Sequence, residues 1–147
     1  MSSIDLKISN LQAFNRRMNK VLDKGVRQEA KKRMERATKL VRGTAINDVQ
    51  RGMKSGTTYE KYRPRRTHTA SAPGQAPATD TGQLVSSIST RVKTEGRKVV
   101  GEIVADAPYA EALEFGTRNM MARPFMQPAL DKNTRKITNI FKKRYFK

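Results

Sequence analysis

The segment Asp106–Arg118, with Ala122–Ala129 closely behind it, constrains the fold of this chain more than any other stretch of the sequence. Asp106 is placed to cap the N-terminus of a helix, and Pro108 follows at an early position where its missing N–H costs nothing. Gly116 is suited to the left-handed C′ position that ends many helices. We therefore expect a short helix here, bounded by a cap and a glycine stop.

Two glutamates lie within this predicted helix. Tyr109 and Leu113 share one helix face, with Ala112 near them, whereas Glu111 and Glu114 sit away from that face. The glutamates are three residues apart, but no nucleophile, orienting group or cofactor loop accompanies them in the sequence. We therefore interpret them as an exposed pair that offsets nearby arginines.

The chain leaves this helix along a path directed by prolines. Thr117–Ala122 is expected to be an exposed loop, and Arg123 is biased toward an extended backbone because it precedes Pro124. Pro128 suits the first turn of a last helix. Such a rigid element is suited to be an assembly joint. The residues that we expect to contact a neighbouring subunit or partner are Tyr109, Glu111, Glu114, Phe115, Arg118, Arg123 and Phe125.

The first third of the chain has helical periodicity. Ile4–Ile8 alternates apolar and polar residues, which predicts a short strand or a free arm. Ser9–Asn10 offers an N-cap for a first helix that ends near Asp23, and Gly25 marks a break or only a weak point.

A longer helix follows, with one apolar stripe and one basic comb. The stripe consists of Val26, Ala30, Met34, Ala37, Val41, Ala45 and Val49. The comb consists of Arg27, Lys31, Lys32, Arg33, Arg36, Lys39 and Arg42. At a rise of about 1.5 Å per residue, this helix would span roughly 35 Å. Its basic face is either a solvated surface or a partner-binding face, and the sequence leaves both interpretations open.

Residues 52–80 are predicted to form one long arm. Its first part is basic with two tyrosines, its second part is small, polar and proline-rich, and neither has an apolar face to bury. A connection of this length is usually functional or disordered. We expect it to be mobile in the free monomer and ordered against something else. The expected contact residues of the arm, which could stack on bases and hold phosphates, are Tyr59, Tyr62, Arg63, Arg65 and Arg66.

Regular structure resumes after the arm. Asp80 or Thr81 can cap a short helix over Gln83–Val85. Ile88–Val92 then alternates apolar and polar residues and predicts a strand. Val99–Ala105 predicts a second strand, so we expect an antiparallel hairpin with a turn between them. The last helix has an apolar side of Ala129, Leu130, Ile137, Ile140, Phe141 and Tyr145. Its basic side consists of Lys132, Arg135, Lys136, Lys142, Lys143 and Arg144.

These elements together predict one α+β domain over residues 1–147, in which N-terminal helices and a C-terminal helix pack on a small antiparallel β-sheet with a long extended loop. The domain divides into an N-terminal strand and helices (1–51), the arm (52–80), a β-hairpin with a short helix (81–127) and a basic C-terminal helix (128–147).

Composition limits the possible functions. The 31 lysines and arginines against 13 acids give a formal net charge of +18, which favours nucleic acid as a partner first and an acidic protein surface second. Cysteine is absent, no apolar run approaches a membrane span, and no signal peptide is seen, so we expect a protein of a reducing cytoplasm with no membrane partner.

The sequence offers no constellation for catalysis. His68, the one histidine, is expected to be a solvated loop residue, and no cluster of ligands has the spacing of a metal site. We expect a protein that is not an enzyme, with no catalytic residue, cofactor or metal.

The order of several short motifs resembles the tail-component family of lambda-like tailed bacteriophages, whose members are described as tail-completion, neck or head–tail joining proteins. The motifs are Ser71–Pro77, Asp80–Leu84, Ser87–Ile88, Pro108–Ala110, Glu114–Thr117, Ala122–Phe125 and Pro128–Ala129. The block Glu-Phe-Gly-Thr followed by Ala-Arg-Pro-Phe is the specific part, and the resemblance covers roughly the C-terminal half.

This resemblance implies a structural protein of the virion, assembled in the host bacterial cytoplasm. It would form a closed ring, with sixfold symmetry to match a tail, between the head–tail connector or adaptor proteins and the tail tube protein. DNA would pass through the lumen without sequence specificity. Because a strongly basic lumen would bind that DNA tightly, most basic side chains are expected to face acidic neighbouring rings or the outside.

In such a ring, Glu111 and Glu114 of one subunit could meet Arg63, Arg65 or Arg66 of the next. Two other functions remain open at this point. One is a basic nucleic-acid-binding module unrelated to a virion, and the other is a small nuclease that uses Glu111 or Glu114.

Overall fold

A computed structural model describes residues 3–4, 24–96 and 98–144 of the chain. Its elements, in chain order, are β1 (Ser3–Ile4), α2 (Lys24–Gln50), β2 (Thr58–Tyr62), β3 (Arg65–Thr69), α3 (Gln83–Ser87), β4 (Ile88–Glu95), β5 (Lys98–Ala105), α4 (Ala110–Phe115) and α5 (Met126–Lys142). The predicted α+β class is confirmed. The predicted first helix over residues 9–23, residues 5–8 of the predicted strand and Tyr145 all lie outside the described residues.

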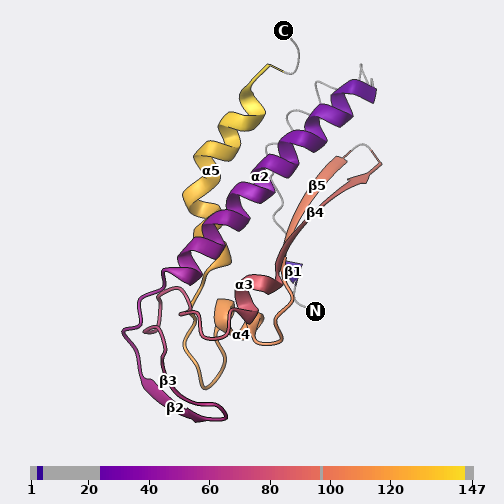
Figure 1. Cartoon of the computed structure of the whole chain (residues 1–147). Coiled ribbons are helices and arrows are strands. Elements are labelled where there is room, and N and C mark those ends of the chain that lie inside the picture. Colours follow the sequence, from indigo (N-terminus) through magenta and orange to yellow (C-terminus); the bar gives the residue numbers. More distant parts are fainter. Residues whose placement is uncertain (1–2, 5–23, 97, 145–147) are drawn as a thin grey trace.

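The long helix α2 is the axis of the fold. In Figure 1, α5 lies along one side of α2, and the strands β4 and β5 run along the other side. All seven residues of the predicted apolar stripe are buried, from Val26 to Val49. Gly25 is the second residue of α2, and the residues of the predicted first helix before it lie outside the described residues. The helix ends at Gln50, where the periodicity of the sequence stops.

One member of the predicted basic comb faces inward. Arg33 is buried, and its Nε donates a hydrogen bond to the carboxylate of Glu29 at 3.1 Å. Its other guanidinium nitrogens donate to three carbonyl oxygens at the end of α5, those of Ile140, Lys143 and Arg144, at 3.2, 2.6 and 2.8 Å. The expectation of an outward-facing Arg33 is therefore wrong, because the free carbonyls at the C-terminus of α5 attract a cation.

The predicted hairpin of β4 and β5 is confirmed. These strands pair antiparallel with Ile88 opposite Ala105, and β1 pairs with the other edge of β5, in the order β1-β5-β4. The face of β5 toward α2 includes Gly101, where an added Cβ would lie only 2.6 Å from Thr38 Cγ2 and 2.7 Å from Met34. The helix therefore approaches the sheet closely because position 101 has no side chain.

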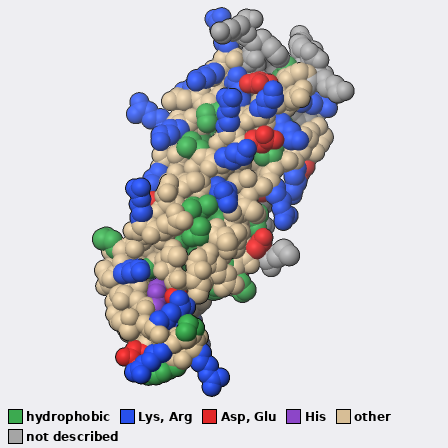
Figure 2. Space-filling model, viewed as in Figure 1, with side chains coloured by type: hydrophobic (Ala, Val, Ile, Leu, Met, Phe, Trp, Pro, Cys, Tyr) green, Lys and Arg blue, Asp and Glu red, His purple; other side chains and the backbone are tan. Residues whose placement is uncertain are grey.

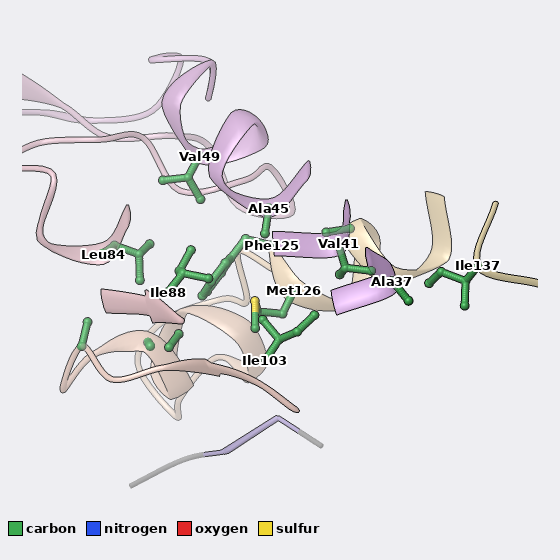
Figure 3. Packing of buried hydrophobic residues seen from close by; sticks show 14 residues of the cluster. Ala37, Val41, Ala45, Val49, Leu84, Ile88, Ile103, Phe125, Met126 and Ile137 are labelled. Atoms are coloured by element: carbon green, nitrogen blue, oxygen red, sulfur yellow. The ribbon is translucent and has the colours of Figure 1, made fainter. Parts of the chain in front are cut away.

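The core lies where α2, α5 and the sheet meet. Figure 3 shows Phe125 and Met126, from the start of α5, between Val41 and Ala45 of α2 and the sheet residue Ile103. Phe125 and Ala45 are 0% exposed, so the chain just before α5 is part of the central packing. This packing holds the start of α5 in a fixed position.

The arm is more ordered than its composition indicated. Thr58–Tyr62 and Arg65–Thr69 pair antiparallel as a two-stranded sheet, and this β2–β3 hairpin extends from the end of the molecule where α2 stops (Figure 1). The predicted arm therefore contains a two-stranded sheet as well as extended segments. The sequence does not reveal these two strands by alternation of apolar and polar residues, because both faces of the hairpin are largely polar.

Neither Asp80 nor Asp106 caps a helix, whereas the hydroxyl of Thr81, the other predicted cap of the short helix, accepts a hydrogen bond from the N–H of Gln83 at 3.4 Å. The residue that precedes α3 is Gly82, at φ +78°, whereas Asp80 binds side chains of the β2–β3 hairpin. The helix α4 begins at Ala110, so Asp106 lies too far upstream to cap it and is exposed. The glycine stop is confirmed, since α4 ends before Gly116 and the N–H of Gly116 donates to Ala112 O at 2.9 Å. Its φ of +74° with ψ of 176° is, however, not the left-handed helical conformation that the sequence predicted.

Candidate assembly interface

The segment around α4 combines one buried acid with several exposed side chains. Glu114 is 5% exposed, and its carboxylate accepts backbone hydrogen bonds from Phe125, Met126 and Gln127 at 2.8, 3.0 and 2.8 Å. These N–H groups lie at the start of α5, where a helix has unpaired donors, and the next residue, Pro128, has no N–H. Glu114 therefore caps α5 from a different helix.

This geometry corrects three expectations. Glu114 is not an exposed partner of Glu111, it cannot meet an arginine of another subunit, and its oxygens are occupied, so it is not available to a nuclease site. Phe125 is 0% exposed and belongs to the core, not to an interface. The sequence places no capping residue just before the predicted last helix. That absence was the signal that a side chain from another segment caps this helix.

Other predicted contact residues of this segment do reach the surface. Phe115 is 68% exposed and Tyr109 is 40% exposed. Glu111 and Arg118 are also exposed, whereas Arg123 is half-buried. Met121, which sequence reasoning did not select, is 71% exposed. Its signal was a large apolar residue inside a predicted exposed loop.

The β2–β3 hairpin presents the predicted arm residues. Tyr59 and Tyr62 are 53% and 73% exposed, and Arg63 and Arg65 are exposed at and beside its turn. Arg66 differs, because it is half-buried and its Nη1 lies 3.1 Å from Asp80 Oδ1. The hairpin thus carries exposed aromatic rings and positive charge together.

Asp80 anchors the hairpin to the body of the molecule. Its carboxylate accepts a hydrogen bond from Lys61 Nζ, forms the ion pair with Arg66, and lies 3.6 Å from His68 Nδ1. The hydrogen bond from Lys61, with the positive charges of His68, Arg66 and Lys61, lowers the pKa of Asp80 below its usual value, although burial opposes this. The expectation of His68 as a solvated loop residue is wrong, since its side chain is 15% exposed in β3.

A cavity of about 340 Å³ lies between the hairpin and α4. Lys61 and His68 of the hairpin line it together with Tyr109 of the α4 segment. The two groups of predicted contact residues, which are distant in the sequence, therefore lie at the same end of the molecule. Sequence reasoning did not find this cavity, because only the tertiary fold brings its walls together.

Lysine and arginine side chains are scattered over the visible surface among other residues (Figure 2). In Figure 2, lysine and arginine side chains extend over the whole face shown, from the end where α2 begins to the β2–β3 hairpin. Within the part of the chain that the structure describes, no group of three or more histidines and acids is placed to hold a metal ion. None of the described helices is both long enough and apolar enough to cross a membrane.

Comparison with known families gives one match. The model of the family described as "Bacteriophage HK97-gp10, putative tail-component" matches residues 12–116, which is more than half of the chain. The match includes α2, the β2–β3 hairpin and α4, whereas the resemblance in short motifs covered only the C-terminal half. No curated protein and no solved structure is significantly similar to the chain.

Proposed function

This chain belongs to the HK97-gp10-like family of bacteriophage tail components, and from that premise we propose that it is a ring-forming tail-completion or neck protein. A tail component is a structural protein of the tailed-phage virion and contacts other head or tail proteins. In the proposed role, the ring joins the head connector to the tail tube, and DNA passes through its lumen without sequence specificity. The protein acts by assembly and does not catalyse a reaction.

The observation that carries this proposal is the position of the exposed apolar side chains. Among the described residues, the large apolar side chains that are exposed are Met53, Tyr59, Tyr62, Tyr109, Phe115 and Met121. All of them lie on the arm or in the α4 segment, at one end of the molecule (Figure 1). Burial of such side chains is a main source of binding energy, so this end is suited to contact other proteins.

A ring requires two different surfaces on each subunit. A heterologous interface joins one patch to another patch of the neighbour, and the contacts close into a ring when the rotation permits. The hairpin group (Met53, Tyr59 and Tyr62) and the α4 group (Tyr109, Phe115 and Met121) are two such surfaces. In the proposed ring, the hairpin of one subunit contacts the α4 group of the next, and the exposed Glu111 meets Arg63 or Arg65 there.

The net charge places a condition on the ring. Each phosphate that binds a lysine or arginine adds about 0.9 to the salt dependence of DNA affinity, so a basic lumen would hold DNA tightly. The basic sides of α2 and α5 therefore face outward or toward acidic neighbouring rings, and the lumen has at most a modest positive charge.

Electron microscopy and native mass spectrometry of the purified protein test the proposal. We expect closed rings, alone or with purified connectors or tails, and weak DNA binding at physiological salt. Phe115→Ser and Tyr62→Ser should each reduce assembly without a loss of stability, whereas Arg135→Ser, on the exposed side of α5, should not. A protein that stays monomeric with connectors and tails, and binds DNA with a steep salt dependence, would instead be a nucleic-acid-binding module.

A further inference from the structure

Some buried polar side-chain atoms at the cavity between the hairpin and α4 have no hydrogen-bond partner. Native proteins provide a hydrogen-bond partner for nearly every buried polar group, so an exception needs an explanation. Within the described ranges, the buried side-chain atoms without a partner are Arg66 Nε, Ser71 Oγ and Arg123 Nε. Ser71 and Arg123 line this cavity, and Arg66 is tied to it through Asp80. Two of these atoms therefore belong to residues that line one cavity, and the third belongs to a residue paired with Asp80 of the same lining, so the site has hydrogen-bond donors to offer a ligand.

The unpaired atoms define the chemistry of that ligand. The Nε–H groups of Arg66 and Arg123 can only donate, and the hydroxyl of Ser71, which is 1% exposed, can donate as well. The ligand must therefore supply acceptor oxygens. A backbone carbonyl has one oxygen, whereas a carboxylate has two and accepts several donors at once.

The charge at the site favours an anion. Of the described residues that line the cavity, Asp80 alone is acidic, and Lys61, Arg66 and His68 already surround its carboxylate. Arg123 also lines the cavity and adds a further positive charge. One carboxylate therefore offsets three permanent cations, and a second carboxylate would be stabilised in the cavity.

We propose that this cavity binds an aspartate or glutamate side chain from an acidic, partly apolar segment of a neighbouring protein of the virion. Leu84, Val85 and Leu113 also line the cavity, so an apolar residue beside the acid has a place to pack. A cavity of about 340 Å³ has room for an acidic side chain and an apolar neighbour, whereas the phosphates of duplex DNA lie on a broad convex surface. An acidic segment is more readily supplied by another protein than by a second copy of this chain, which has 13 acids against 31 lysines and arginines.

Fluorescence anisotropy with a labelled peptide tests this site in the full chain. The probe is a fluorescein-labelled hexapeptide of alternating leucine and aspartate, and the matched probe has asparagine in place of aspartate, both near 0.15 M salt. Arg123→Met should weaken binding of the aspartate peptide at least about tenfold and Ser71→Ala about threefold. The control Arg91→Met, which removes an exposed arginine of β4, should change the affinity less than about twofold.

Chemical-shift mapping by NMR on the unmodified protein makes the test independent of any variant that fails to fold. The aspartate peptide should shift the amides of Ser71, Thr79–Leu84 and Arg123. The proposal is wrong if the asparagine peptide binds equally well, or if Arg91→Met and Arg123→Met weaken binding equally. It is also wrong if duplex DNA or self-association competes for the site with the same dependence on Arg123, because the occupant would then be a phosphate or a second copy.

The proposal rests on the function proposed above only for the source of the acidic segment. Failure of the wild-type protein to form rings, with specific peptide binding retained, would overturn the ring and leave the site intact. Normal rings from a protein that does not bind the aspartate peptide would overturn the site and leave the ring intact.

Discussion

The carboxylate of Glu114 accepts a hydrogen bond from the backbone N–H of Phe125 at 2.8 Å, so two residues from different segments fix the start of α5. At the other end of α5, the guanidinium of Arg33 donates to the carbonyl oxygens of Lys143 and Arg144. A negative charge therefore lies at the N-terminus of the helix and a positive charge at its C-terminus, as the helix dipole favours. Both ends of α5 are held by side chains from outside the helix.

Replacement of Glu114 should destabilise the protein strongly. Glu114→Ala leaves three backbone N–H groups at the start of α5 without their acceptor, and we expect a loss of about 2–4 kcal/mol in the free energy of unfolding. Glu114→Gln retains one acceptor oxygen and should cost less. Chemical denaturation measures the effect. Glu111→Ala, an exposed change on the same helix, serves as the control and should stay within about 0.5 kcal/mol.

Replacement of Arg33 should loosen the contact between α2 and the end of α5. Arg33→Met keeps the apolar stem but removes the donors to Ile140, Lys143 and Arg144, at an expected cost of about 1–3 kcal/mol. Amide hydrogen exchange should rise most in the last turn of α5. Arg36→Met, on the exposed side of α2, is the matched variant. Equal effects from both variants would mean that net charge, and not the contact, is responsible.

Two glycine-to-alanine changes should have opposite signs. Gly101→Ala places a methyl group 2.6 Å from Thr38 Cγ2, so α2 must move away from β5, and we expect a loss of about 1–3 kcal/mol. Gly43 lies within α2 with nothing near its added Cβ, and Gly43→Ala should stabilise the protein by up to about 1 kcal/mol. Thermal unfolding of both variants measures this contrast. If the Gly101→Ala protein is as stable as the wild type, α2 does not approach β5 as closely as the structure shows.

The attachment of the β2–β3 hairpin should weaken in acid. Because the folded state lowers the pKa of Asp80, this contact contributes stability that is fully present above the ordinary aspartate pKa of about 3.9 and is lost as the pH falls through the lowered value. NMR shifts of Lys61, Arg66 and His68 should follow that loss in a titration from neutral pH downward.

At neutral pH, Asp80→Asn should produce the same changes in the NMR shifts of the hairpin as acid does in the wild-type protein. The exposed control Asp106→Asn should leave these NMR shifts unchanged. Hairpin shifts that do not change with either pH or Asp80→Asn would show that Asp80 does not anchor this segment.

The elements that the sequence predicted well are those whose signal is local and repeated. The stripe from Val26 to Val49 recurs over many turns, so the position and the buried face of α2 follow from periodicity alone. The hairpin of β4 and β5 and the stop at Gly116 likewise depend on neighbouring residues. Capping by Asp80 and Asp106 failed, because in this fold the first anchors a hairpin and the second precedes α4 by several residues.

By itself, the sequence determined the α+β class, the course of α2 and the excess of positive charge, since these follow from composition and from the spacing of apolar residues. Only the tertiary structure decided that Glu114 and Phe125 are buried, that Arg33 points inward, and that the hairpin and α4 share a cavity. The physical reason is that the sequence alone does not specify which groups surround a charged side chain in the folded protein. Its role depends on the backbone donors, carbonyls and opposite charges that distant segments bring to it when the chain folds.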